Sequence, residues 1–478
     1  MAWQEYRVQR FAGINQSVSQ NLLDSGESPD ARNMDTSGGR LSVARGYVRA
    51  SDAALASPGD FDRLYVWSRD GGRIFVAAGA GGISVLPENA AAWRGIHSYA
   101  AGARGTGLDF QNLKLASTEY LVAADGASQP VKWDGGAETE AAPFGSAEAL
   151  SDRPVAYLEL YYSRLFAAGD PAYPCRLYWS CAPGDARTPE DWSSVAEGEN
   201  VSGGHVEIGT DSDPITGLFS LSNQLLIFKR DSLYRLLGDR PSNYRICPLG
   251  AAMRGPSHTA CVRYGDVLYF LTEAGLYYFD GQNVRRSPDA DKVKDFLAAA
   301  DLSDCRAAAC GDRLYFALKT GAAAAANDAL LVYDLVRGSY MIRDGFTARG
   351  LCAYGGRLYI LDGAGRVCRF EEGESYDGAR IDAYWYTPLT DLDSKIAVKQ
   401  LKELYLRGSG GLLGVSAETG GREAYYERVM PEPDGSVLEA PLTALGRSFR
   451  LKLENVGGSR FTVDGGLELL LDLRRRAL

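Results

Sequence analysis

A short β-forming phrase recurs seven times along this chain of 478 residues. Each copy joins a glycine or polar pair to two or three apolar β-formers, most clearly in Gly265–Phe270, Gly311–Phe316 and Gly355–Ile360. The fourth positions of the copies are Ile74, Tyr120, Leu165, Leu226, Leu268, Leu314 and Leu358, so the intervals are 46, 45, 61, 42, 46 and 44 residues. One four-stranded propeller blade uses about 40–50 residues, and this period is therefore typical of a β-propeller.

Within one repeat, two apolar runs flank a short loop. Leu268–Thr272 and Gly275–Phe279 are separated by Glu273 and Ala274, which is the pattern of an antiparallel hairpin. The runs are nearly continuous in apolar residues, which indicates strands that are covered on both faces, as between neighbouring blades. Because one blade cannot bury both faces alone, the copies must stack and close into a ring.

The sequence predicts an all-β protein with three parts. Residues 55–375 are predicted to form a six- or seven-bladed β-propeller, and the long third interval indicates a rim insertion at about 170–210. Residues 376–478 contain alternating strands separated by Gly, Asp and Pro turns, which favours a C-terminal β-sandwich domain. Residues 1–54 are polar and rich in turns, so we expect an irregular N-terminal arm that serves as an inter-subunit segment.

Charge and hydropathy exclude several classes of function. The formal net charge is −10, which does not favour indiscriminate binding to a polyphosphate. No window approaches the roughly 18 apolar residues of a membrane-spanning helix. The first residues, Met1–Tyr6, lack the basic and apolar plan of a signal peptide. We therefore expect a soluble protein, made in the cytoplasm, with no membrane-spanning segment.

The search for chemistry in the sequence predicts no catalytic, cofactor-binding or metal-binding residue. The three histidines, His97, His205 and His258, are far apart and lack metal-ligand spacing. Asp211 and Asp213 could hold a calcium ion, but their loop lacks the spacing and the closing Glu of an EF-hand.

An enzyme with a propeller fold remains an alternative interpretation, because propeller hydrolases gather carboxylates at the central channel. The candidate carboxylates are Asp266, Asp312, Glu273 and Asp362. All four stand at turn positions of the repeat, where turn chemistry alone explains an acidic residue. We therefore expect a non-enzymatic protein, with a propeller glycoside hydrolase as one alternative.

Three regions of the chain, the leader, a middle stretch and a closing stretch, resemble a family of virion proteins. The leader contains Phe11–Asn15, Ser28–Asp35 and Gly39–Tyr47, in the form G-(I/L)-N, A-x-N-(M/V) and G-x-L-x-x-x-x-G. The stretch Asp213–Gly238 and the closing Gly446–Leu453 belong to the same resemblance. These segments are similar to the propeller-containing tail nozzle, or tail-tube hub, proteins of short-tailed bacteriophages.

The resemblance implies a mechanical function. It implies a homo-oligomeric ring, with six subunits as is usual in phage tails, that forms a conduit for genomic DNA during ejection. The implied partners are the tail adaptor or portal-proximal proteins and tail fibres, and the implied location is the virion. An acidic chain suits a conduit, because DNA binding depends on neutralising phosphates. A propeller scaffold or host-receptor-binding module is the other alternative.

Overall fold

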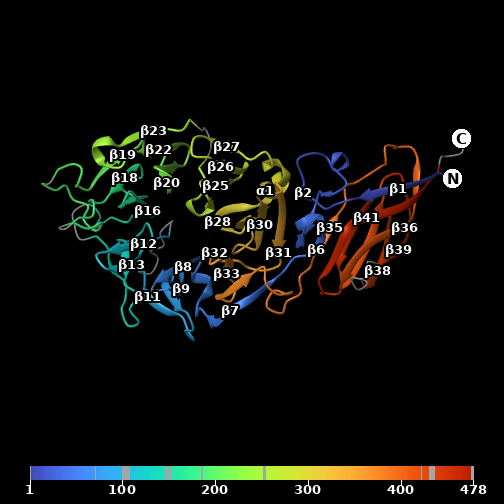
Figure 1. Cartoon of the computed structure of the whole chain (residues 1–478), viewed down its shortest axis with the longest axis horizontal. Coiled ribbons are helices and arrows are strands. Elements are labelled where there is room, and N and C mark those ends of the chain that lie inside the picture. The colour runs from blue at the N-terminus through green and yellow to red at the C-terminus, as the bar shows by residue number, and fades with distance from the viewer. Residues whose placement is uncertain are drawn as a thin grey trace.

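In the computed structural model, seven β-sheets stand around one axis and a β-sandwich lies beside them (Figure 1). The structure describes residues 2–69, 71–99, 108–145, 150, 153–184, 187–196, 198–250, 255–420, 422–429 and 436–474. Within these ranges no helix is long and apolar enough to cross a membrane. The all-β prediction with a propeller and a C-terminal sandwich is confirmed, and the number of blades is seven.

The first three blades are four-stranded antiparallel sheets whose strands follow chain order. Blade 1 contains β8 (Arg63–Arg69), β9 (Gly72–Gly79), β10 (Gly82–Pro87) and β11 (Arg94–His97). Blade 2 contains β12 (Asp109–Leu115), β13 (Thr118–Ala124), β14 (Val131–Trp133) and β15 (Ala142–Pro143). Blade 3 contains β16 (Tyr157–Tyr161), β17 (Arg164–Ala168), β18 (Arg176–Trp179) and β19 (Gly204–Glu207).

Blades 4 to 6 repeat this order. Blade 4 contains β20 (Ile215–Leu221), β21 (Gln224–Lys229), β22 (Leu233–Leu237) and β23 (Arg245–Pro248). Blade 5 contains β24 (Cys261–Tyr264), β25 (Val267–Thr272), β26 (Gly275–Phe279) and β27 (Val284–Arg286). Blade 6 contains β28 (Asp301–Cys310), β29 (Arg313–Lys319), β30 (Ala329–Asp334) and β31 (Ser339–Asp344), followed at its outer edge by β2 (Gly13–Ile14) and β3 (Glu27–Ser28).

Blade 7 is closed by a strand from the N-terminal part of the chain. Its first strands are β32 (Gly350–Tyr354), β33 (Arg357–Leu361) and β34 (Arg366–Phe370), and its outer strand is β7 (Tyr47–Ala54). Phe370 pairs with Tyr47, and Arg369 pairs with Val48. The predicted boundary between residues 54 and 55 is therefore wrong, because it separates a propeller strand from its sheet. Because an outermost strand has a solvent-exposed face, β7 carries polar residues and lacks the continuous apolar pattern of a buried strand.

The recurring sequence phrase marks the second strand of every blade. The seven fourth positions lie on β9, β13, β17, β21, β25, β29 and β33. Every residue of β17 and of β21 is buried, as the continuous apolar runs predict. The first strands of neighbouring blades, such as β16 with β20 and β28 with β32, contact one another around the axis. The blades are therefore ordered outward from a central tunnel lined by their first strands.

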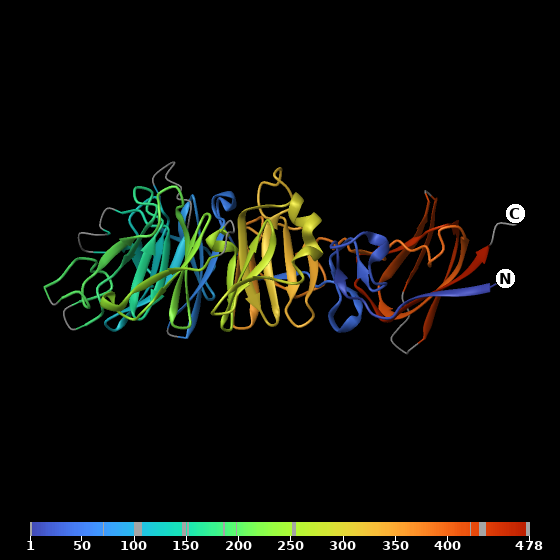
Figure 2. The ribbon, with the colours of Figure 1, turned by 90° about the horizontal axis from the view of Figure 1, so that it is seen from above.

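The sandwich consists of two sheets, and the N-terminal segment contributes strands to both. One sheet runs β39 (Val437–Gly446), β36 (Val398–Gly410) and β41 (Phe461–Arg474), and β41 then pairs with β6 (Leu41–Val43), next to β5 (Met34–Asp35), and with β1 (Ala2–Val8). The other sheet runs β38 (Arg422–Val429), β37 (Leu412–Thr419), β40 (Arg450–Asn455), β35 (Tyr384–Tyr386) and β4 (Ala31–Arg32). Figure 2 shows the N-terminal segment, in blue, between the propeller and the C-terminal strands.

The N-terminal segment is therefore part of the folded body and not an irregular arm. Its apolar side chains Val8, Phe11 and Met34 are buried, and the rings of Tyr6 and Phe11 contact Phe449 and Trp385 at centroid distances of 5.6 and 5.5 Å. The strand pairs are short and their partners lie more than 300 residues away, so local patterns could not reveal them.

Short helices occupy the connections. They are η1 (Gln20–Leu22), η2 (Ser37–Gly39), η3 (Pro58–Asp60), η4 (Pro241–Asn243), η5 (His258–Ala260), η6 (Ala290–Val293) and α1 (Lys294–Ala299). The predicted rim insertion at 170–210 contains the long connection between β18 and β19, residues 180–203.

Candidate functional site

The first candidate site is the junction, which we define by Asn33, Asp35, Arg313, Arg343 and Asp344. Asn33 follows β4 and has a φ of 54°, a left-handed conformation that Asn tolerates better than most residues. Its amide nitrogen donates to Asp344 Oδ1 at 2.8 Å and to the Asp382 carbonyl at 2.7 Å. Its amide oxygen accepts from the Asp344 backbone N–H at 2.9 Å and the Tyr376 hydroxyl at 3.0 Å.

One buried amide therefore ties three segments together: the leader, blade 6 and the linker that enters the sandwich. Asn33 is 1% exposed, and its backbone also bonds to Ile342 and Ala44. All four hydrogen-bonding positions of the side chain are filled, which is what burial of an amide requires.

A buried charge cluster adjoins Asn33. Arg343 has no solvent exposure; its guanidinium donates to the Met34 carbonyl and lies 3.3 Å from Asp35 Oδ2. Arg313 lies 2.9 Å from the same oxygen and 3.2 Å from Glu371 Oε1. Burial alone would raise the pKa of Asp35, but the Arg343 and Arg313 charges outweigh it and hold that pKa well below its ordinary value. The leader is thus locked to blade 6 by charge as well as by backbone pairing.

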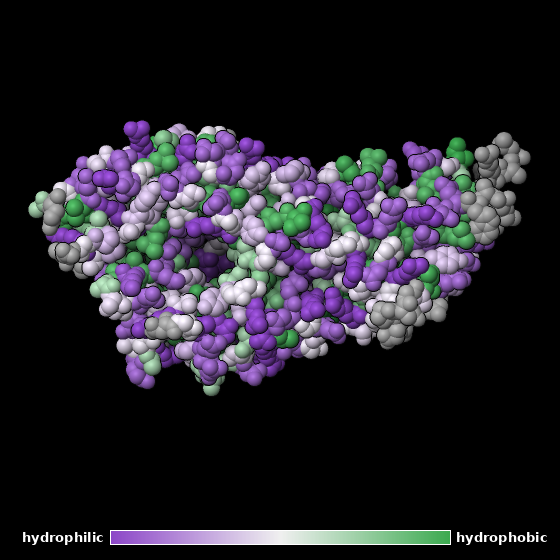
Figure 3. Space-filling view, in the orientation of Figure 1, coloured by the Kyte–Doolittle hydropathy of each residue, from purple (hydrophilic) through white to green (hydrophobic). Residues whose placement is uncertain are grey.

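The second candidate site is the central tunnel. Figure 3 shows a hollow at the centre of the propeller with hydrophilic residues inside it. His258 on η5 lies 3.2 Å from Asp109 at the start of blade 2, and its ring stacks on Phe219 of blade 4 at 4.6 Å. Blades 2 and 5 stand on opposite sides of a seven-bladed ring, and η5 immediately precedes blade 5. The His258 side chain therefore reaches across the propeller axis to blade 2.

Charged groups of both signs surround this pair. Burial alone would raise the pKa of Asp109. The His258 contact and a hydrogen bond from the Leu158 backbone N–H lower that pKa by more, so the net shift is downward. Burial and the neighbouring Arg306 lower the pKa of Arg63, although a guanidinium stays charged at neutral pH. Arg306 in turn lies 3.7 Å from Asp62.

Glu159 lies on β16, a first strand that lines the tunnel, and its titration falls near neutral pH. Its side chain is 13% exposed, and burial raises its pKa to about 7. A bond of 2.6 Å from the Ser220 hydroxyl and the Arg263 guanidinium at 3.8 Å oppose this rise without cancelling it. A carboxyl with this pKa can take up or release a proton under physiological conditions.

Replacing Glu159 by Gln should stabilise the protein at high pH only. Because the folded-state pKa of Glu159 is raised, its contribution to stability is fully present below its ordinary value of 4.5 and is lost as the pH rises through about 7. We expect Glu159→Gln to gain roughly 1–3 kcal/mol at pH 8 and almost nothing at pH 5. Urea unfolding at the two pH values measures this difference.

The exposed Glu119 on β13 provides the matched control. Glu119→Gln should change the free energy of unfolding by less than about 0.5 kcal/mol at both pH values. An equal effect of Glu159→Gln at pH 5 and pH 8 would show that its carboxyl does not titrate in this window.

The structure does not bring the four turn carboxylates together. Asp266 and Asp312 lie between the first and second strands of their blades, whereas Glu273 and Asp362 lie between the second and third strands. These two kinds of turn are at opposite ends of an antiparallel blade. Asp312 accepts a bond from the Tyr264 hydroxyl, and Asp362 accepts the backbone N–H groups of its own turn. The Asp362 carboxylate thus stabilises its own turn, and Asp312 links blade 6 to the Tyr264 hydroxyl of blade 5.

The remaining candidates are also separate. Asp213 bonds to the Asp231 backbone and the Ser232 hydroxyl, and Asp211 is exposed in the same connection. His97 lies on β11 and His205 on β19, whereas His258 reaches the tunnel. Among the described residues, no three His, Cys, Asp or Glu side chains gather so as to hold a metal ion. The tunnel network was missed because its members come from different blades and share no sequence spacing.

Comparisons with known proteins show no family for this chain. No protein-family model matches the chain, and no curated protein matches it. Among solved structures, BBS1N, crystallised in complex with ARL6DN, is 11% identical with a TM-score of 0.42, covering 69% of this chain and 98% of its own. The AfRom2 CNH domain is 8% identical with a TM-score of 0.40, covering 68% and 98%. Similarities this distant carry no argument about function.

Proposed function

We propose that this chain is a non-enzymatic structural protein of a tailed-bacteriophage virion, a ring-forming tail nozzle or hub subunit that encloses a conduit for DNA ejection. The observation that carries the proposal is the position of the leader residues. The three leader segments that resemble the nozzle family form β2, β4, β5 and β6, the strands that join propeller and sandwich. Three of the five resembling segments therefore lie where the propeller and the sandwich are joined, which suits a subunit that must transmit force without bending.

The exposed apolar side chains support assembly through the sandwich and the N-terminal segment. Among the described residues, the exposed large apolar side chains are Val18, Leu22, Tyr162, Val336, Leu389, Ile396, Val437 and Leu445. Six of these eight lie outside residues 55–375. Exposed apolar side chains are typical of surfaces that contact another subunit. The ring would therefore form through the sandwich and the N-terminal segment, with the propellers on its outside.

A charge at Ile396 should therefore weaken the ring. Ile396 is 80% exposed, so Ile396→Glu should leave the unfolding temperature nearly unchanged while reducing the oligomeric fraction severalfold. The matched control is Val336→Glu, at a position 71% exposed on the blade 6 turn, which should assemble normally. Mass photometry of concentrated protein measures both variants against the parent chain.

Two further measurements bear on the proposal. Cryo-electron microscopy of the parent virion should show a closed ring, with six copies expected from the family resemblance. A DNA gel shift at physiological salt should show no retention, as the net charge of −10 predicts. A strictly monomeric protein that is absent from purified particles would refute the proposal and favour an isolated scaffold or an enzyme.

A further inference from the structure

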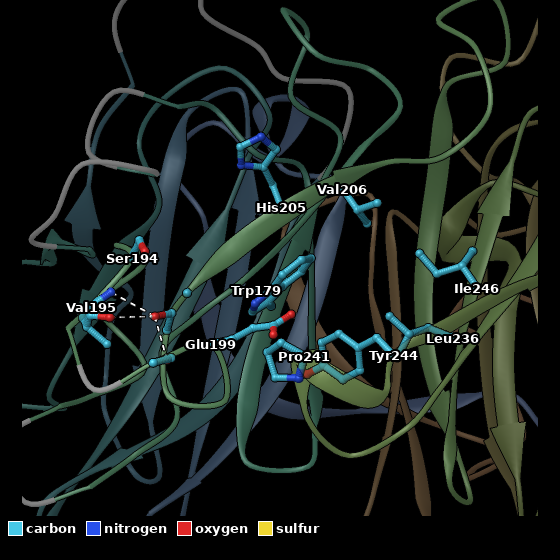
Figure 4. A pocket seen from close by; sticks show the side chains of 13 residues that line it. Trp179, Ser194, Val195, Glu199, His205, Val206, Leu236, Pro241, Tyr244 and Ile246 are labelled. Carbon is cyan, nitrogen blue, oxygen red and sulfur yellow. Dashed lines mark hydrogen bonds between the residues drawn. The ribbon is translucent and has the colours of Figure 1, made fainter.

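A cavity of about 630 Å³ lies on the outer rim of the propeller, between the long β18–β19 connection of blade 3 and the outer strands of blade 4. Its volume falls within the roughly 300–1,000 Å³ of small-molecule sites. Figure 4 shows its lining side chains, which come from both blades. The cavity is distant in the fold from the junction and from the tunnel, and neither of those sites uses its residues.

The connection that forms one wall is held in place by buried polar groups. Arg164 is 2% exposed, and its guanidinium donates to the carbonyls of Ser180, Asn200 and Ser202. The Ser202 hydroxyl accepts from the Val195 backbone N–H at 2.9 Å and donates to the Gly198 carbonyl at 2.9 Å, contacts drawn as dashed lines in Figure 4. The wall is therefore preorganised, although it belongs to a loop of the chain.

Two aromatic rings form the floor. Trp179 and Tyr244 lie 5.6 Å apart between ring centroids with planes at 84°, one from each blade. The indole fits because position 204 is glycine: a Cβ there would lie 2.6 Å from Trp179 Cζ2. Figure 4 shows the Tyr244 ring directed toward Pro241 and Glu199.

The polar atoms of both rings lack partners. Trp179 Nε1 and Tyr244 Oη are buried, and among the described residues neither has a hydrogen-bond partner. A buried donor left unpaired costs about 1–3 kcal/mol, and a ligand oxygen that accepts from it would recover part of this cost. Beside them, the exposed Glu199 offers a carboxylate that can accept hydrogen bonds.

We propose that this rim pocket binds a saccharide. A sugar ring presents an apolar C–H face to the indole and phenol rings, and its hydroxyls both accept from the unpaired N–H and O–H and donate to Glu199. An apolar ligand would leave the donors unpaired. A phosphate or sulfate would meet Glu199, and no Lys or Arg is among the described lining residues to bind it.

The test uses the full-length protein on an array of neutral and acidic oligosaccharides. The strongest binder is then titrated calorimetrically. Tyr244→Phe removes only the unpaired hydroxyl, so it should weaken binding about tenfold without lowering the unfolding temperature. Trp179→Phe, which removes the N–H donor and part of the ring, should weaken binding at least as much.

The matched control is Tyr161→Phe. The Tyr161 hydroxyl donates to the Asn223 carbonyl at 2.9 Å outside the pocket, so this variant should lose some stability and keep full affinity. The proposal is overturned if no saccharide on the array binds the parent protein. It is also overturned if Tyr244→Phe and Trp179→Phe both bind as the parent does. Because a monomer would carry the same pocket, the result is independent of ring formation.

Discussion

Deletion of residues 1–40 should prevent the sandwich from folding. The deletion removes β1, whose seven residues pair with β41 from Leu467 to Leu473, together with β2 to β5. It also removes the buried side chains Val8, Phe11 and Ile14. Each such side chain contributes about 1.5–3 kcal/mol, against a typical domain stability of about 5–15 kcal/mol. We expect an insoluble product, or a sharp loss of the sandwich unfolding transition in calorimetry.

This expectation corrects the sequence-based prediction of an irregular arm, since a separable arm would leave a folded monomer. Two neighbouring substitutions on β1 test the reason. Val8→Asp, at a position 1% exposed, should destabilise by several kcal/mol, whereas Arg7→Asp, whose side chain is 53% exposed, should cost less than about 1 kcal/mol. If the truncated chain unfolded at the parent temperature, the strand pairing of β1 would be dispensable.

Replacing Asn33 by Ala should destabilise the protein by about 4 kcal/mol. The change removes four buried side-chain hydrogen bonds and leaves the Tyr376 hydroxyl and the Asp344 backbone N–H without that partner. It also places alanine at a φ of 54°, which alanine tolerates less well than asparagine. Urea unfolding of the full chain measures the loss.

Asn89→Ala isolates the backbone component of this effect. Asn89 has a φ of 64° and is exposed, and no side-chain hydrogen bond joins it to the described residues. Its replacement should cost about 1 kcal/mol. A difference below about 1 kcal/mol between the two alanine variants would contradict the assignment of Asn33 as the centre of the junction.

The repeat predicted the propeller because blade burial is a local property. Leu314 and Leu358 stand on second strands, which are covered on both faces, so their neighbours in sequence must be apolar as well. The same local argument placed the insertion at 170–210 and the sandwich strands after residue 376. It did not decide between six and seven blades, because β7 has one exposed face and lies far from β34 in the sequence.

Local sequence patterns could not predict the two candidate sites or the rim pocket. His258 and Asp109 are far apart in the sequence and meet only because the closed ring brings blades 2 and 5 to opposite sides of one tunnel. Trp179 and Tyr244 meet because the insertion folds against the next blade. In each case the residue types are ordinary for their local element.

Hydrophobic periodicity and turn residues act over a few neighbouring positions, so local sequence was enough to identify the repeating unit and its all-β character. The closure of the ring by β7, and the joining of the leader to blade 6 and the sandwich, became visible only in the folded chain. Backbone hydrogen bonds are the same for every strand, so an open sheet edge accepts many partners. The choice among them depends on burial of side chains such as Asn33, Arg343 and Phe11, whose neighbours are set only when the whole chain is folded.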